Sequence, residues 1–347
     1  MENFSAKKYF ERISTDEALS LLKTADLATL GERANAARRK IHSDNAFYAV
    51  NAAITYSNIC QACCPICSFF RREGEKGAYL LSPEDVFEQA KKYSQMGAEE
   101  IHTIGGIYHK LPFEYYLDVV RAVKRADGKL NVVSYTVSEC ALMSEVSGLP
   151  LRDVMQKLVE AGTDALPGGG AEIFAPQVRT KITPNKLSGT QWLAAMQTAH
   201  EVGLKTNATM LYGHIETPED VVEHLDMLRR QQDTSGGFKA FVPLPFRQGG
   251  SAIPAKNSGV YDLKICAIAR LMLDNFAHIR VPVPHFGDRM TQVLLNWGAD
   301  DIGGTHWHEE VATSAGAPEC TRTPEFMRGI ITAAGFKPVK TNSNYAL

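Results

Sequence analysis

Four of the seven cysteines in this 347-residue sequence lie within eight residues, in the stretch NICQACCPICSFF (Asn58–Phe70). Three of them, Cys60, Cys64 and Cys67, follow a C-x3-C-x2-C spacing, and Cys63 interrupts it. Thiolates are soft ligands that suit iron–sulfur clusters as well as zinc. A structural zinc site usually has four ligands in two separated pairs, and the sequence contains no second pair. The spacing therefore favours a 4Fe–4S cluster held by three cysteines.

Three cysteine ligands on a cluster of four irons leave one iron without a protein ligand. That iron can chelate the amine and the carboxylate of a small molecule. Buried structural cysteines are the plain alternative, but three cysteines at this spacing in one loop argue against it. A non-catalytic iron–sulfur or zinc-binding protein remains the alternative from another functional class.

The composition is that of an ordinary globular protein, with 44% hydrophobic and 22% charged residues. A net charge of -2 and a pI near 6.6 predict no nucleic-acid partner and no anionic membrane surface. The N-terminal stretch lacks the apolar run of a signal peptide, and no apolar stretch is long enough to span a bilayer. We therefore expect a cytoplasmic protein whose thiols are reduced.

Several helices are predicted from their capping residues. Ser82 and Pro83 open one helix and Gly97 closes it, and Thr217 and Pro218 open another in the same way. Apolar periodicity predicts further helices at Pro112–Arg125, Leu151–Ala161, Thr190–Val202, Leu263–Phe276 and Thr291–Trp297.

Short apolar runs between the helices predict eight strands, so helices and strands alternate along most of the chain. This alternation implies an α/β fold with a parallel sheet, and eight units imply a (β/α)8 TIM-type barrel, with an open doubly wound sheet as the alternative. We expect a helical preface in residues 1–45 and the barrel with a C-terminal extension in residues 46–347. The expected strands are Tyr48–Tyr56, Glu100–Ile104, Asn131–Tyr135, Ala165–Leu166, Lys205–Leu211, Phe238–Val242, His278–Val283 and Asp300–Ile302.

Polar loops follow the predicted strands, at the end of the barrel where such folds carry their chemistry. His214 and Glu216 come directly after the fifth strand, where a histidine can bind a carboxylate or act as an acid, so we take them as candidate catalytic residues. Ser138 and Glu139 follow the third strand and are predicted either to face a ligand or to cap a helix.

The cysteine spacing, with Phe69 two places beyond the last cysteine, resembles the cluster loop of the radical S-adenosylmethionine (SAM) superfamily. Further stretches resemble the branch that contains the menaquinone (futalosine-pathway) and deazaflavin radical enzymes. HKLPFEYYLDVVRAVK together with GGGAEIF is most similar to the aminofutalosine synthases. The likeness runs from about Ser14 to Tyr345, nearly the whole chain.

The resemblance implies that a reduced cluster cleaves SAM, a consumed co-substrate, to methionine and a 5′-deoxyadenosyl radical. The radical then adds to the alkene of 3-[(1-carboxyvinyl)oxy]benzoate, the aryl ring migrates, and a carboxyl group leaves as bicarbonate or CO2. Such a transferase takes its electron from a donor such as flavodoxin or ferredoxin. Two relatives remain alternatives, the dehypoxanthine futalosine cyclases and the deazaflavin (FO) synthase subunits.

The resemblance also assigns SAM-binding roles to individual residues. Gly105 and Gly106, after the second strand, are expected to bind the amine of the methionine part, with a simple tight turn as the alternative. Glu172, in the PGGGAE turn, is expected to accept hydrogen bonds from the ribose, and Arg179 to pair with the Glu172 carboxylate. Phe69 is expected to border the adenine.

A substrate with two carboxylates requires cationic or amide donors in a mostly apolar pocket. Four residues in the loops after the sixth to eighth strands could supply these donors. They are Arg247, His285, Arg289 and His308.

Overall fold

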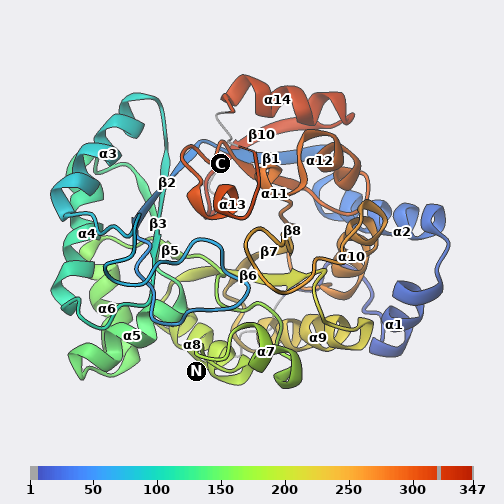
Figure 1. The fold of residues 1–347 in the computed structure, drawn as a ribbon. Coiled ribbons are helices and arrows are strands. Elements are labelled where there is room, and N and C mark those ends of the chain that lie inside the picture. The colour runs from blue at the N-terminus through green and yellow to red at the C-terminus, as the bar shows by residue number, and fades with distance from the viewer. Residues whose placement is uncertain (1–6, 319–321, 346–347) are drawn as a thin grey trace.

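A parallel sheet of seven strands forms the wall at the centre of the molecule, and the strands follow one another in sequence order (Figure 1). The computed structural model describes residues 7–318 and 322–345. Each strand pairs in parallel with the next. The strands are β2 (Asn51–Ser57), β3 (Glu100–Gly105), β4 (Asn131–Ser134), β5 (Ala165–Leu166), β6 (Lys205–Tyr212), β7 (Phe238–Pro245) and β8 (His278–Ile279).

An eighth segment closes the wall between β8 and β2. Strand β9 (Asp301–Gly304) touches the chain after β8 through a single parallel bridge from Asp301 to Arg280. Three residues beyond β9, Trp307 forms a second single bridge, to Ala52 in β2. The predicted α/β barrel of the TIM type is therefore confirmed, with its seam at β9.

A small second sheet lies beside this seam. Its strand order is β10-β1-β9, with β1 at Asn45–Ala49 and β10 at Lys337–Thr341, and both pairings are parallel. Strand β9 thus belongs to the small sheet by its ladder. It is joined to the barrel by the bridge from Asp301 and by the bridge from Trp307 beyond its end. The prediction of one strand at Tyr48–Tyr56 is wrong, because the chain leaves the small sheet at Ala49 and enters the barrel at Asn51.

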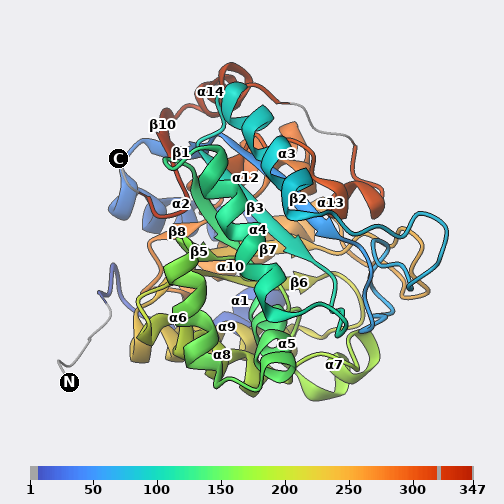
Figure 2. The ribbon, with the colours of Figure 1, turned by 90° about the vertical axis from the view of Figure 1, so that its left-hand side faces the viewer.

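Helices cover the outer face of the barrel wall, as two perpendicular views show (Figures 1 and 2). Ser82 and Thr217 cap helices α3 and α9 with proline in the first turn, which confirms those two predictions. The principal covering helices are α3 (Pro83–Gln95), α4 (Phe113–Ala126), α5 (Val137–Ser147), α6 (Leu151–Ala161), α8 (Gly189–Glu201), α9 (Pro218–Ser235) and α10 (Gly259–Met272).

Two helices precede the barrel, α1 (Thr15–Thr24) and α2 (Leu27–His42), and they lie against α9 and α10 (Figure 1). Arg229 of α9 donates to the carbonyl of Ile13, 2.9 Å away, which ties the preface to the barrel. The division of the chain after residue 45 remains a prediction. Among the described residues, no helix is both long enough and apolar enough to cross a membrane.

Several short elements were not expected from the sequence. The segment expected as a polar loop after the third strand is the start of α5, so Ser138 and Glu139 lie in a helix. The others are α7 (Pro176–Ile182), α11 (Val283–Phe286), α12 (Asp288–Leu295), which replaces the helix expected at Thr291–Trp297, α13 (Glu310–Ser314), α14 (Pro324–Ala333) and β10.

Candidate active site

The cysteine loop leaves β2 and folds over the end of the barrel. The backbone N–H of Cys67 donates to the carbonyl of Cys64 at 3.0 Å, which makes a tight turn, and the N–H of Ile107 donates to the Cys60 sulfur at 3.3 Å. Burial raises the pKa of the Cys64 thiol to about 12. Cys63 adopts a positive φ of 45° and directs its sulfur toward the carbonyl of Cys60, at 3.4 Å.

Two glycines at the end of β3 allow the cysteine loop to lie close to the barrel. A Cβ on Gly106 would come within 2.0 Å of the Ile59 carbonyl oxygen, and one on Gly105 would come within 2.4 Å of the Tyr56 ring. Both positions therefore exclude a side chain for reasons of packing. Their predicted contact with the SAM amine stays a prediction, and the close packing itself places this backbone beside Cys60.

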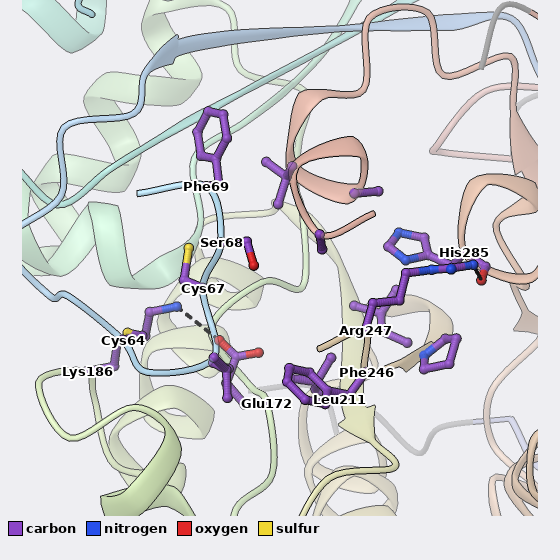
Figure 3. A pocket seen from close by; sticks show the side chains of 16 residues that line it. Cys64, Cys67, Ser68, Phe69, Glu172, Lys186, Leu211, Phe246, Arg247 and His285 are labelled. Carbon is purple, nitrogen blue, oxygen red and sulfur yellow. Dashed lines mark hydrogen bonds and ion pairs between the residues drawn. The ribbon is translucent and has the colours of Figure 1, made fainter. Parts of the chain in front are cut away.

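A cavity of about 230 Å³ opens beside this loop (Figure 3). Cys64, Cys67 and Phe69 line one wall, and Arg247 and His285 lie across the cavity from them (Figure 3). The loop after β7 helps to hold the cysteine loop in place, since Ser251 donates to the carbonyl of Pro65 at 2.7 Å. Two of the three predicted cluster ligands thus face the same space as two predicted substrate ligands.

The floor of the cavity beside the cysteines carries an ion pair between Glu172 and Lys186, with Nζ and Oε1 2.9 Å apart (Figure 3). Burial acts to raise the pKa of Glu172, but Lys186 holds it below its usual value. The prediction that Arg179 pairs with Glu172 is wrong. The Arg179 guanidinium instead donates to the carbonyls of Gly170, Ala171, Ile173 and Leu187 and fixes the PGGGAE turn.

Glu139 has no free acceptor site for a ligand. Its carboxylate accepts from the Tyr56 hydroxyl at 2.7 Å, the Gly105 N–H at 2.9 Å, and the N–H and hydroxyl of Thr136 at 2.7 and 2.8 Å. Glu139 therefore caps α5 and positions β3, which is the capping alternative of its prediction. Ser138 differs, because its buried hydroxyl has no hydrogen-bond partner among the described residues.

His214 and Glu216 fold back on their own turn. The Ile215 N–H donates to Nδ1 of His214 at 2.7 Å, and Nε2 of His214 lies 3.1 Å from the carbonyl of Leu211. Glu216 accepts from the N–H groups of Gly213 and His214 at 2.5 and 2.8 Å. The two side chains also pair, with Nδ1 of His214 2.9 Å from Oε2 of Glu216. Neither residue lines the cavity, and their catalytic role stays a prediction.

The four predicted substrate ligands divide into two pairs. Arg247 and His285 line the cavity, and Arg247 donates to the His285 carbonyl at 2.8 Å while its buried Nε has no partner among the described residues. Burial lowers the pKa of His285 to about 4, with Arg247 adding to the effect. Arg289 and His308 are exposed and do not line the cavity, so their placement at the substrate is not supported.

The donor set fits a cluster better than a single metal ion. In the described part of the chain, only His42, His278 and Asp300 bring three metal-ligand atoms within 4.8 Å of one another. The sulfurs of Cys60, Cys64 and Cys67 therefore do not all lie this close to one another, as the ligands of a single zinc ion would. Asp300 in turn pairs with buried Arg270, which explains that histidine group without a metal.

Comparison with known sequences places the protein in a class. Residues 54–228 match the Radical SAM superfamily, and residues 235–347 match the CofH/MqnC C-terminal region. The chain belongs to the radical SAM superfamily, in the branch suggested by its sequence, and it is an enzyme that uses a 4Fe–4S cluster and SAM. Two solved structures share its fold at 18% identity. Methylornithine synthase has a TM-score of 0.74 with 96% of each chain covered, and the hydrogenase maturase HydG has a TM-score of 0.75 with 96% and 74% covered.

Within this branch, the chain is similar to enzymes with more than one name. Aminodeoxyfutalosine synthase from Thermus thermophilus is 41% identical over 349 residues, which cover 98% of this chain and 94% of the relative. The enzyme of that name from Streptomyces coelicolor is 34% identical, covering 97% and 91%. A 5-amino-6-(D-ribitylamino)uracil–L-tyrosine 4-hydroxyphenyl transferase from Methanopyrus kandleri is 35% identical, covering 90% and 87%.

Proposed function

We propose that this protein is an aminofutalosine (aminodeoxyfutalosine) synthase. It would join the 5′-deoxyadenosyl part of SAM to 3-[(1-carboxyvinyl)oxy]benzoate and release a carboxyl group as bicarbonate or CO2. The observation that carries the proposal is the cavity, which has cluster cysteines on one wall and the Arg247–His285 pair on the other. The 41% identity to the Thermus thermophilus synthase over nearly the full length supports the same assignment.

In this proposal Cys60, Cys64 and Cys67 hold the cluster, which supplies the electron that cleaves SAM. Phe69 covers the adenine from the same loop, and the Glu172–Lys186 pair holds a hydrogen-bonding carboxylate at the cavity wall for the ribose. Arg247 offers its buried, unpartnered Nε to a substrate carboxylate, since an ionic hydrogen bond to an unpaired buried donor is strong. The apolar side chains of Leu211, Leu244 and Phe246 exclude water from the radical.

The test is anaerobic incubation of the reconstituted enzyme with SAM, a reductant and the enolpyruvyl benzoate. The expected product is a covalent adenosyl adduct, detected by mass spectrometry together with methionine. Formation of 5′-deoxyadenosine without an adduct would contradict the proposal and favour a hydrogen-abstracting relative.

The second candidate is the 4-hydroxyphenyl transfer named for the Methanopyrus kandleri relative, which is 35% identical. Incubation with tyrosine and 5-amino-6-(D-ribitylamino)uracil in place of the benzoate separates the two functions. We expect no coupled product from this pair. The physiological electron donor is proposed to be a flavodoxin or ferredoxin, which a reconstituted electron-transfer assay can identify.

A further inference from the structure

Inside the barrel, the side chains of β3 keep accessible surface only from His102 toward the cysteine loop. Glu100, His102 and Ile104 share one face of β3, because alternate residues of a strand point the same way. Glu100 is buried, whereas His102 and Ile104 keep part of their surface accessible. Leu211 and Leu244, near the ends of β6 and β7, are also half-buried and line the cluster cavity. Along this face of β3, accessible side-chain surface therefore begins at His102.

His306 lies at the same level and is the most conspicuous unpartnered side chain there. No described residue makes a hydrogen bond to either of its ring nitrogens, and Nε2 is completely covered. Enclosure by protein lowers its pKa well below 6.5, yet the side chain keeps some accessible surface. Its backbone has a positive φ of 46°, which is unfavourable for a side chain of this size.

The backbone around His306 is shaped to hold the ring inside the barrel. A Cβ on Gly303 would lie 2.7 Å from Nε2 of His306, and Gly303 itself has a φ of 76°. Asn51, at the start of β2, accepts the His306 N–H at 2.8 Å, and a Cβ on Gly304 would lie 2.2 Å from this same oxygen. Strained conformations of this kind persist where the surrounding structure enforces them, and they concentrate at functional sites.

His102 is held by a carboxylate from below. Its Nε2 lies 2.5 Å from Oε1 of Glu100 and 3.4 Å from the Asn51 amide. Burial acts to raise the pKa of Glu100, but His102 and nearby Arg280 hold it well below its usual range, so it is ionised. The pairing fixes Nε2 of His102 as the donor and leaves Nδ1 as an acceptor. The rings of His102 and His306 meet edge to face, with centroids 6.3 Å apart.

We infer that His306 and His102 line the floor of the substrate chamber and that His306 binds one carboxylate of a small dicarboxylate, while Arg247 binds the other at the mouth. The inference rests on the proposed function and adds a position for the second carboxylate. The cluster cavity of about 230 Å³ is below the roughly 300–1,000 Å³ of ordinary ligand pockets, so SAM and substrate need the space beneath it as well.

The charges around His306 determine what happens when a carboxylate binds. His102 from β3, His285 from α11 and Arg280 after β8 lower its pKa, and Glu100 opposes them. A carboxylate beside the ring adds an opposite charge and raises the pKa, so binding favours the uptake of a proton by His306. A purely structural histidine would not show this uptake.

The experiment measures binding by calorimetry to the reconstituted holoenzyme with SAM and without reductant. The probes are the dicarboxylate 3-[(1-carboxyvinyl)oxy]benzoate and its two monocarboxylate analogues, 2-phenoxyacrylate and 3-(vinyloxy)benzoate. His306→Ala is expected to weaken the binding of the dicarboxylate and of one monocarboxylate by about tenfold or more, and to leave the affinity for the other monocarboxylate unchanged. Arg247→Ala should weaken the binding of the dicarboxylate and of the other monocarboxylate instead. The inference is overturned if His306→Ala binds all three probes with wild-type affinity. It is also overturned if His306→Ala and Arg247→Ala lose affinity for the same monocarboxylate.

Proton uptake provides a second readout. It remains usable if the alanine variant folds poorly, because it is measured on the wild-type enzyme and on a glutamine variant. Repeating the wild-type titration in buffers of different ionisation enthalpy should show uptake, and His306→Gln should lose it. His224→Gln is the matched control, because His224 is fully buried on α9 and hydrogen-bonds the Thr209 carbonyl at 2.9 Å. It should keep wild-type uptake. A wild-type enzyme that binds no dicarboxylate would refute the proposed function as well, whereas normal binding without uptake refutes the inference alone.

Discussion

Cys63 differs from its three neighbours in backbone conformation rather than in chemistry. Its positive φ of 45° turns its sulfur to the Cys60 carbonyl, away from the cavity that Cys64 and Cys67 line. We therefore expect Cys63→Ser to retain the cluster, with wild-type iron content and visible absorbance after reconstitution. Serine at Cys60, Cys64 or Cys67 should lose most of the iron, since thiolate ligands are required. Equal loss at Cys63 would show that the ligand assignment is wrong.

Arg247 and Arg289 provide a matched pair of arginines, one in the cavity and one outside it. Arg247→Gln removes a buried donor that has no other partner, and we expect KM for the benzoate substrate to rise roughly 10- to 100-fold. Arg289→Gln alters an exposed side chain and should leave KM within about twofold. Steady-state kinetics decide the question, and equal effects of the two variants would contradict the placement of the substrate carboxylate.

The sequence predicted a cation beside the Glu172 carboxylate but chose the wrong one, and the ligand role of the three cysteines stays a prediction. Arg179 lies on α7, where its fork meets the carbonyls of the preceding turn. The chain returns after α7 and brings Lys186 to Glu172, while Asn185 donates to the Ala62 carbonyl of the cysteine loop. Such a return depends on tertiary contacts, which residue spacing does not reveal.

At the scale of elements, the contact between the end of β3 and the cysteine loop requires glycine. Gly106→Ala would place a Cβ 2.0 Å from a backbone oxygen, and backbone cannot move aside as a side chain can. We expect the variant to fold but to bind about half the wild-type iron or less after reconstitution. Gly128→Ala is the control, because that glycine is exposed and its nearest neighbour would be 3.9 Å away. Full iron content in Gly106→Ala would refute this account.

Elements with local signals were predictable, and elements defined by distant partners were not. Ser82 and Thr217 mark α3 and α9 through capping groups within four residues. The break between β1 and β2 has no such signal, because both strands are almost entirely buried and apolar, and only their partners β10 and β3 distinguish them. Glu139 had a readable capping box with Thr136, which predicts α5 in hindsight.

For the whole molecule, buried neutral histidines predict loss of stability in acid. Burial lowers the pKa of His200 and of His224 from 6.5 to about 3. Below pH 6.5 the unfolded chain takes up protons at both sites and the folded chain does not, so stability falls as pH decreases from 6.5 toward 3. At pH 5.5 each site costs about 1.4 kcal/mol. The denaturation midpoint should fall accordingly, and His224→Gln should remove the share of this one site, about 1.4 kcal/mol at pH 5.5.

The number of alternating units predicted the barrel, and alternation alone was sufficient because parallel strands joined by helices have few other arrangements. The way the barrel closes was not predictable. Asp300–Ile302 was expected as an ordinary eighth strand, whereas β9 forms its ladder with β1, and the segment pairs with the barrel by isolated bridges from Asp301 to Arg280 and from Trp307 to Ala52. That choice depends on β10, which the sequence did not indicate.

The seam at β9 also has a kinetic consequence. Between β2 and β3, six residue pairs are in register, but the seam joins β8 and β2 to the segment from Asp301 to Trp307 by one bridge on each side. Local opening at the seam does not require a continuous ladder to break, as it does between β2 and β3. Amide hydrogen exchange should therefore be faster in residues 302–307 than in β2 or β3. Because His306 lies in this segment, a bound dicarboxylate should slow exchange at the seam and hold the barrel closed.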